Sequence, residues 1–193
     1  MIKSILVAII FLSFFNNAAH SQAQFRERTK PDYVWAELGF CKGAAYFFDK
    51  KSNDLVKDNS YSTPLFKPLG VIGALGLGKN SFQFRVRTQV FLPDINGLGM
   101  GDVSLLFGGI KRFNKLAFDA NIGVGFQGAY IHTIGNDSRD VQKVGAIMEA
   151  NLIYSIWKYF AVNPFVAATI NPKVWSTSIG IKLVTGKLRY GKK

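Results

Sequence analysis

One short stretch of the chain carries the side-chain types that ester hydrolysis or acyl transfer needs. His132 is followed by Asp137, Ser138 and Asp140, so a base, a nucleophile and an orienting acid lie close together in sequence. Ile134 stands where a His-x-Ser pair would place its serine, and the alternation of the preceding residues turns His132 outward at the end of a strand. We therefore expect the chain not to be an enzyme, and a hydrolase or acyltransferase acting through His132 is the alternative.

A second set of ionisable residues recurs on one face of the predicted strands. Its members are Glu37, Arg85, Arg87, Asp102, Asp119, Lys143, Glu149 and Lys182. Four cations stand against four anions, as a closed interior requires, because an unpaired buried charge is costly. We expect a salt-bridged plug in which Arg85 or Arg87 pairs with Glu37 or Glu149. A narrow, gated or ion-selective pore is the alternative use of the same residues.

Strict alternation of apolar and polar residues predicts the elements that carry these side chains. Between Ser81 and Leu92 the apolar residues share one parity, and Arg85 and Arg87 fall on the other. The same period predicts eight strands, over residues 33–48, 69–78, 81–92, from 102 onward, 116–127, 144–154, 159–170 and 174–185. The seventh is the least regular, because Pro164 has no N–H to donate to a ladder.

The connections between these strands alternate in length. Short turns are predicted at Lys79-Asn80, Arg112 to Lys115 and Trp157-Lys158, whereas Pro93 to Gly101 and Ile131 to Gln142 are expected to be loops. This asymmetry, with apolar residues outside and charges inside, predicts an all-β fold, an eight-stranded antiparallel up-and-down transmembrane β-barrel. A soluble lipocalin-like barrel, the alternative, would place its apolar residues inside.

The N-terminus predicts export. Residues 1–23 have a cation at Lys3, an apolar run and small residues before a cleavage point, which is typical of a secretory signal peptide. Residues 24–32 form a basic lead, and 33–193 form the single barrel domain. We therefore expect the protein in the bacterial outer membrane.

The composition limits the classes of partner that the protein can bind. The net charge is +12, and export excludes nucleic acid as the cause of this basic balance. The excess lies in the short turns and the tail, where lysines are expected to contact anionic phospholipid or an acidic protein at the periplasmic rim. The single cysteine, Cys41, excludes an intrachain disulfide and a cysteine-rich zinc site, and no cofactor or metal is expected.

Two phrases carry a resemblance to a known group of proteins. The signal ends Ser21-Gln22-Ala23-Gln24, and a later strand contains Asn163-Pro164-Phe165-Val166-Ala167. With the alternating strands, they make the chain resemble the small outer-membrane β-barrel proteins of Bacteroidetes-type bacteria. The resemblance implies contact with outer-membrane lipids including lipopolysaccharide. It also implies a structural or interaction role, as a membrane anchor or as an accessory factor of a surface or secretion complex similar to the PorT-type proteins of the type IX system.

Overall fold

The computed structural model describes residues 32–48, 50, 52, 54, 65–66, 69–92, 99–132 and 138–187. The predicted signal peptide and the basic lead up to residue 31 lie outside these ranges. None of the described segments is a helix long and apolar enough to cross a membrane.

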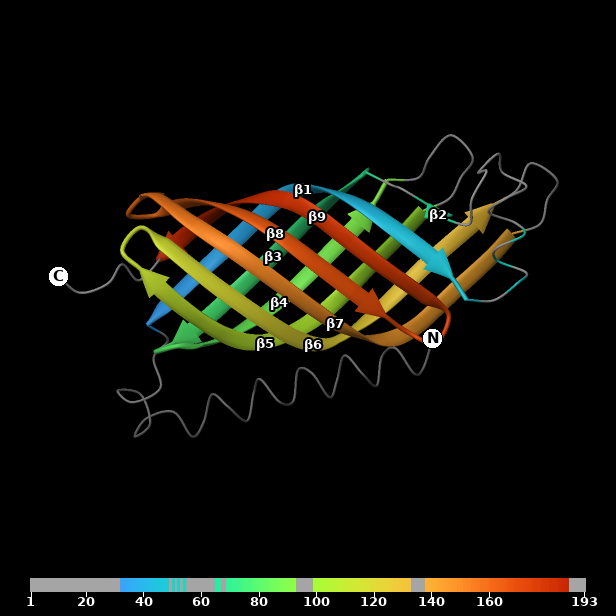
Figure 1. Cartoon of the computed structure of the whole chain (residues 1–193), viewed down its shortest axis with the longest axis horizontal. Helices are drawn as coiled ribbons and strands as arrows, with labels where there is room; N and C mark the ends of the chain where they lie inside the picture. Colours follow the sequence, from blue (N-terminus) through green and yellow to red (C-terminus); the bar gives the residue numbers. More distant parts are fainter. Residues whose placement is uncertain are drawn as a thin grey trace, which may run out of the picture. The chain divides into compact units, whose positions relative to one another are not determined.

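Eight long antiparallel strands close into a barrel, which confirms the predicted fold class (Figure 1). They are β1 (Tyr33–Phe47), β3 (Leu69–Lys79), β4 (Phe82–Phe91), β5 (Gly99–Phe113), β6 (Leu116–His132), β7 (Ser138–Trp157), β8 (Phe160–Ile170) and β9 (Val174–Lys187). Each strand pairs with its neighbour in sequence, and β1 pairs with β9 from Val34↔Lys187 to Phe47↔Val174. The unpredicted β2 (Leu65–Phe66) adds a short pairing to β1.

Tight turns join the strands at one end of the barrel, which we call the turn end, on the left in Figure 1. Asn80, between β3 and β4, and Asn114, between β5 and β6, have φ angles of 55° and 53°. Asparagine tolerates this left-handed conformation, which type I′ and II′ hairpin turns have at their first central residue. The opposite end is the loop end.

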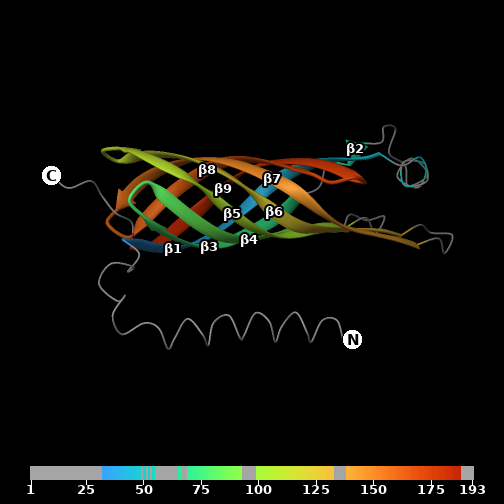
Figure 2. The same cartoon turned by 90° about the horizontal axis from the view of Figure 1, so that it is seen from below.

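Figure 2 shows the barrel wall from a second direction. Burial alternates along the strands where they form the closed wall, as a barrel requires. The outward side chains are largely apolar and exposed, for example Leu38 at 71% and Phe40 at 73%, whereas Glu37 beside them is buried. The polar parity thus faces the lumen and the apolar parity faces outward, opposite to a soluble barrel.

The β6–β7 hairpin corrects one predicted boundary. Residues 131–142 were expected to be a polar loop, but the two strands stay paired as far as His132↔Ser138. The β7–β8 pairing ends at Ala146↔Ile170, so the hairpin continues past β8 at the loop end. A two-stranded ladder satisfies its backbone groups without a buried face, so polar residues there do not end the strands.

The strand with the irregular pattern, β8, is present and contains Pro164. Its pairing with β7 runs through Asn151↔Phe165 and resumes at Tyr154↔Val162, on either side of the proline. On its other edge, Pro164 pairs with Ile181 of β9. The missing N–H therefore interrupts one ladder and leaves the strand in the barrel.

Candidate functional site

Seven of the eight predicted site residues meet in the middle of the lumen. They come from six strands and are all buried: Glu37 on β1, Arg85 and Arg87 on β4, Asp102 on β5, Asp119 on β6, Glu149 on β7 and Lys182 on β9. Their inward parity follows from the alternation of each strand, and barrel closure brings them together. We call this group the charge network.

Glu149 is the member with the most cation partners. Its Oε1 atom contacts Arg85 Nη1 and lies 2.9 Å from Lys182 Nζ. Its Oε2 atom lies 3.0 Å from Arg87 Nη1. One carboxylate therefore links the cations of β4 and β9.

The two arginines differ in their other partners. Arg87 Nη2 lies 2.8 Å from both carboxylate oxygens of Asp102, on the neighbouring strand. Arg85 Nη2 lies 3.0 Å from Asp119 Oδ2 and 3.2 Å from Glu37 Oε1. Ion pairs of this kind replace the water that the buried charges have lost.

Amide side chains extend the charge network. Asn151 Nδ2 donates to Asp119 Oδ1 at 2.6 Å, and Asn121 Nδ2 donates to the same oxygen at 2.7 Å. Asn163, on β8, donates to Asn151 Oδ1 at 3.0 Å. Sequence reasoning did not assign these amides to the site, although their inward parity was the available signal.

An apolar cluster covers the charge network toward the turn end. It consists of Tyr33, Trp35, Ile110, Ala117, Ile153, Ala161 and Val184. Trp35 donates from Nε1 to Glu37 Oε1 at 2.8 Å, and the Arg85 guanidinium carbon lies 5.6 Å from the centre of its ring. Trp35 thus caps the network by a hydrogen bond and a cation–π contact.

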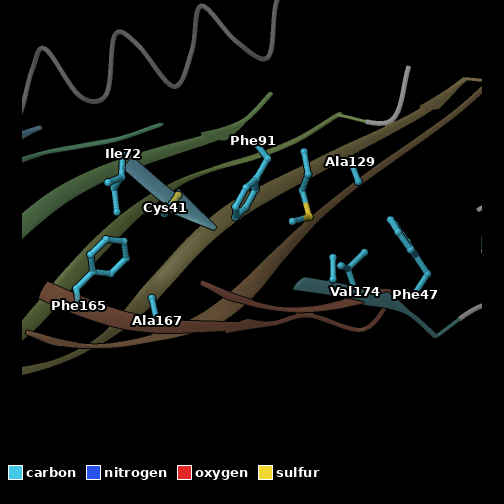
Figure 3. Close-up of a cluster of buried hydrophobic side chains, with 10 residues drawn as sticks. Cys41, Phe47, Ile72, Phe91, Ala129, Phe165, Ala167 and Val174 are labelled. Atoms are coloured by element: carbon cyan, nitrogen blue, oxygen red, sulfur yellow. The ribbon is translucent and has the colours of Figure 1, made fainter. Parts of the chain in front are cut away.

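A second apolar cluster lies on the loop-end side of the charge network, and Figure 3 shows its side chains. It consists of Cys41, Ala45, Phe47, Ile72, Phe91, Met100, Ala129, Phe165, Ala167 and Val174. In Figure 3, Ile72 and Phe165 point toward each other from different strands. Lys182 Nζ lies 4.6 Å from the centre of the Phe165 ring, so this ring is the counterpart of Trp35.

The eighth predicted residue, Lys143, is not part of the charge network. Its side chain is exposed, and it lies on β7 beyond the last β7–β8 pair, Ala146↔Ile170. The expected balance of four cations and four anions therefore does not hold. The seven buried residues are three cations and four carboxylates.

The residues of the alternative enzymatic site lie at the end of the β6–β7 hairpin. Strand register sets His132 opposite Ser138, and Tyr130 opposite Asp140. Asp137 lies outside the described residues, as do the side chains of His132, Ser138 and Asp140. In the described ranges, no three His, Cys, Asp or Glu side chains are placed to hold a metal ion.

Comparison with known proteins places the fold. No protein-family model matches the chain, and no curated protein is similar to it in sequence. The barrel is similar to Neisserial surface protein A (NspA), with a TM-score of 0.63 and 9% identity over 80% of this chain and 97% of that one.

Two further structures agree with the first. Ail, the attachment invasion locus protein of Yersinia pestis, has a TM-score of 0.58 and 13% identity over 81% of this chain and 99% of that one. The outer membrane protein OprG from Pseudomonas aeruginosa has a TM-score of 0.53 and 9% identity over 80% of this chain and 96% of that one. The chain therefore has the fold of the eight-stranded outer-membrane β-barrel proteins.

Proposed function

We propose that the protein is an integral barrel of the bacterial outer membrane with a plugged lumen, and that it acts as a structural or interaction component. The supporting observation is the order of layers in the lumen, where the charge network lies between two apolar clusters. Trp35 and Phe165 cap its cations on the two sides. Eight strands leave an interior just wide enough for side chains to fill.

The outer surface supports a membrane location. Exposed apolar side chains cover the strands, as contact with lipid requires, and all backbone groups of a closed barrel wall can pair within it. Lipids of the outer membrane, including lipopolysaccharide, are then the immediate surroundings of the wall.

A plugged barrel acts through its surfaces, which favours a membrane anchor or an accessory factor of a surface or secretion complex. The sequence resemblance to Bacteroidetes-type barrels makes a PorT-type role in secretion the specific form of this proposal. Cross-linking in native membranes followed by purification should recover a stoichiometric protein partner. Recovery of the barrel alone, with its lipids, would contradict a role in a complex.

Conductance tests the plug against the narrow pore. The protein in planar lipid bilayers should show no large steady conductance, because Arg85, Arg87 and Lys182 are fully buried between the two clusters. A double variant, Trp35→Ala with Phe165→Ala, is the matched control, since it removes both rings that cap the network. Its conductance should exceed that of the wild type. A steady open channel in the wild type would contradict the plugged lumen.

A lipid-modifying hydrolase or acyltransferase is the second candidate, and one observation favours it. The β6–β7 register sets His132 directly opposite Ser138 at the loop end. Release of acyl chains from lipopolysaccharide by the purified protein, abolished by His132→Ala, would support it. We expect the wild type and this variant to be equally inactive.

A further inference from the structure

Five lysines surround the turn end of the barrel and form what we call the lysine belt. Lys79 ends β3, Lys111 lies near the end of β5, Lys115 follows it in the turn, Lys158 lies in the β7–β8 turn, and Lys187 ends β9. All five side chains are exposed.

Three belt lysines lie on the lipid-facing side of the wall. Lys79 pairs with Phe82, Lys111 with Phe118 and Lys187 with Val34. These three partners are exposed apolar residues of the outward parity. The aliphatic stems of the lysines therefore lie along the apolar wall, and their amines reach the polar boundary of the membrane.

Aromatic rings indicate that the membrane boundary lies at the level of these lysine amines. Lys111 Nζ lies 5.3 Å from the centre of the Phe113 ring, and Lys158 Nζ lies 5.2 Å from that of Tyr159. Trp157 and Phe160, both exposed, pack edge to face in the same turn. Aromatic girdles mark the membrane–water interface of such barrels, so the amines lie at the depth of the lipid head groups.

The charge around the belt is strongly one-sided. Among the described residues at the turn end outside the lumen, Asp32 is the carboxylate, and its Oδ2 atom accepts a hydrogen bond from the Asn80 backbone N–H at 2.9 Å. Arg112 has the inward parity, with its guanidinium carbon 4.4 Å from the centre of the buried Tyr33 ring, so it is not part of the belt. A ring of cations at head-group depth is complementary to lipid phosphate.

We propose that the lysine belt binds the phosphate groups of anionic phospholipids in the membrane leaflet at the turn end. The outward direction of Lys79, Lys111 and Lys187 favours lipid over a protein bound beneath the barrel. The belt would fix the depth of the barrel in the membrane and collect negatively charged phospholipid around it. The inference is independent of what the protein does at the loop end.

Lipid retention tests this assignment. The protein is reconstituted in vesicles of phosphatidylcholine and phosphatidylglycerol, extracted mildly, and the lipids that remain bound are counted by native mass spectrometry. Each lysine on a phosphate should contribute up to about a five-fold preference for the anionic lipid. Wild-type protein should thus retain phosphatidylglycerol selectively, and high salt should weaken the selectivity.

Two variants and one control make the result specific. Replacing Lys79, Lys111 and Lys187 by glutamine should strongly reduce the selectivity, and replacing the same three by arginine should keep it. The control is Lys143→Gln, an exposed lysine at the loop end, which should retain wild-type selectivity. Folding of each variant is checked by gel electrophoresis in detergent, where a folded barrel migrates differently in an unheated sample than in a heated one. If the glutamine variant does not fold, the arginine variant supplies the comparison.

Three outcomes would overturn the proposal. Equal retention of the two lipids by the wild type would show that the belt is only solvated. In a second experiment, lipopolysaccharide replaces phosphatidylglycerol. If the protein retains lipopolysaccharide selectively but not phosphatidylglycerol, the bound phosphate belongs to a lipid of the other leaflet. A co-purifying protein lost in the glutamine variant, with lipid retention unchanged, would make the belt a protein-binding surface.

Discussion

Lys182 Nζ lies 2.7 Å from Glu37 Oε2, and this ion pair joins the last strand of the barrel to the first. Lys182 is the register partner of Gly39 on β1, so Glu37 is its diagonal neighbour across the closure. Lys182 also contacts Glu149 on β7. Lys182 thus takes part in the β1–β9 backbone pairing, and its side chain connects these two strands to the charge network.

Loss of Lys182 should strongly destabilise the barrel. Lys182→Met leaves two arginines against four buried carboxylates, and an uncompensated buried charge costs about 3–5 kcal/mol. The measurement is the free energy of unfolding in lipid vesicles by urea titration. Lys143→Met is the control, expected within about 0.5 kcal/mol of the wild type because its side chain is exposed. Equal effects of the two variants would contradict the network.

Glu149→Gln should cost less than Lys182→Met, although Glu149 has more partners. The variant leaves three cations and three carboxylates: Arg87 keeps Asp102, while Arg85 and Lys182 keep Glu37. The expected loss is about 1–3 kcal/mol, the range for a broken buried hydrogen bond. The same unfolding titration ranks the two variants. The reverse order would mean that contact number, and not charge balance, governs stability.

The wall of the barrel was predictable from sequence because each strand repeats every two residues. Parity alone assigned Glu37 and Arg85 to the inside, and Leu38 and Phe84 to the outside. The same rule assigned Lys143 to the lumen, where it does not lie. Parity predicts which face of a strand a residue lies on, but not its position along the barrel axis. For Lys143 that position depends on how far β8 extends beside β7.

The contacts within the lumen were beyond the reach of sequence. Parity places Arg85 and Asp119 inside, but the pairing between them depends on how eight strands are staggered around the closed barrel. The role of Asn151 as a bridge between Asp119 and Glu149 depends on the same stagger. One-dimensional patterns carry no information on which inward residues share a level.

Gly76 should be required for the cap formed by Trp35. The two residues are register partners, and a Cβ atom at Gly76 would lie 2.2 Å from the Trp35 ring. Gly76→Ala should therefore displace the ring from Arg85 and destabilise the barrel by about 1–3 kcal/mol, as overpacking does.

Gly73→Ala, on the same strand, is the matched control for this change. A Cβ atom there would meet its nearest neighbour, the Glu37 carbonyl oxygen, at 3.7 Å, an ordinary contact. Fluorescence of Trp35, in a background with Trp157 and Trp175 replaced by phenylalanine, should change in Gly76→Ala only. An unchanged spectrum and stability in Gly76→Ala would show that the ring does not lie over this glycine.

Asn80 should tolerate glycine better than alanine, because its φ angle of 55° is the property that the turn needs. Alanine in the left-handed region costs about 1–2 kcal/mol, whereas glycine adopts it freely. The backbone N–H of residue 80, which donates to Asp32, is present in all three proteins, so loss of that hydrogen bond cannot explain a difference. Unfolding titrations of Asn80→Ala and Asn80→Gly, repeated at Asn114 with its φ of 53°, should give the same order at both turns. Equal stability of the alanine and glycine variants would show that the left-handed conformation does not limit these hairpins.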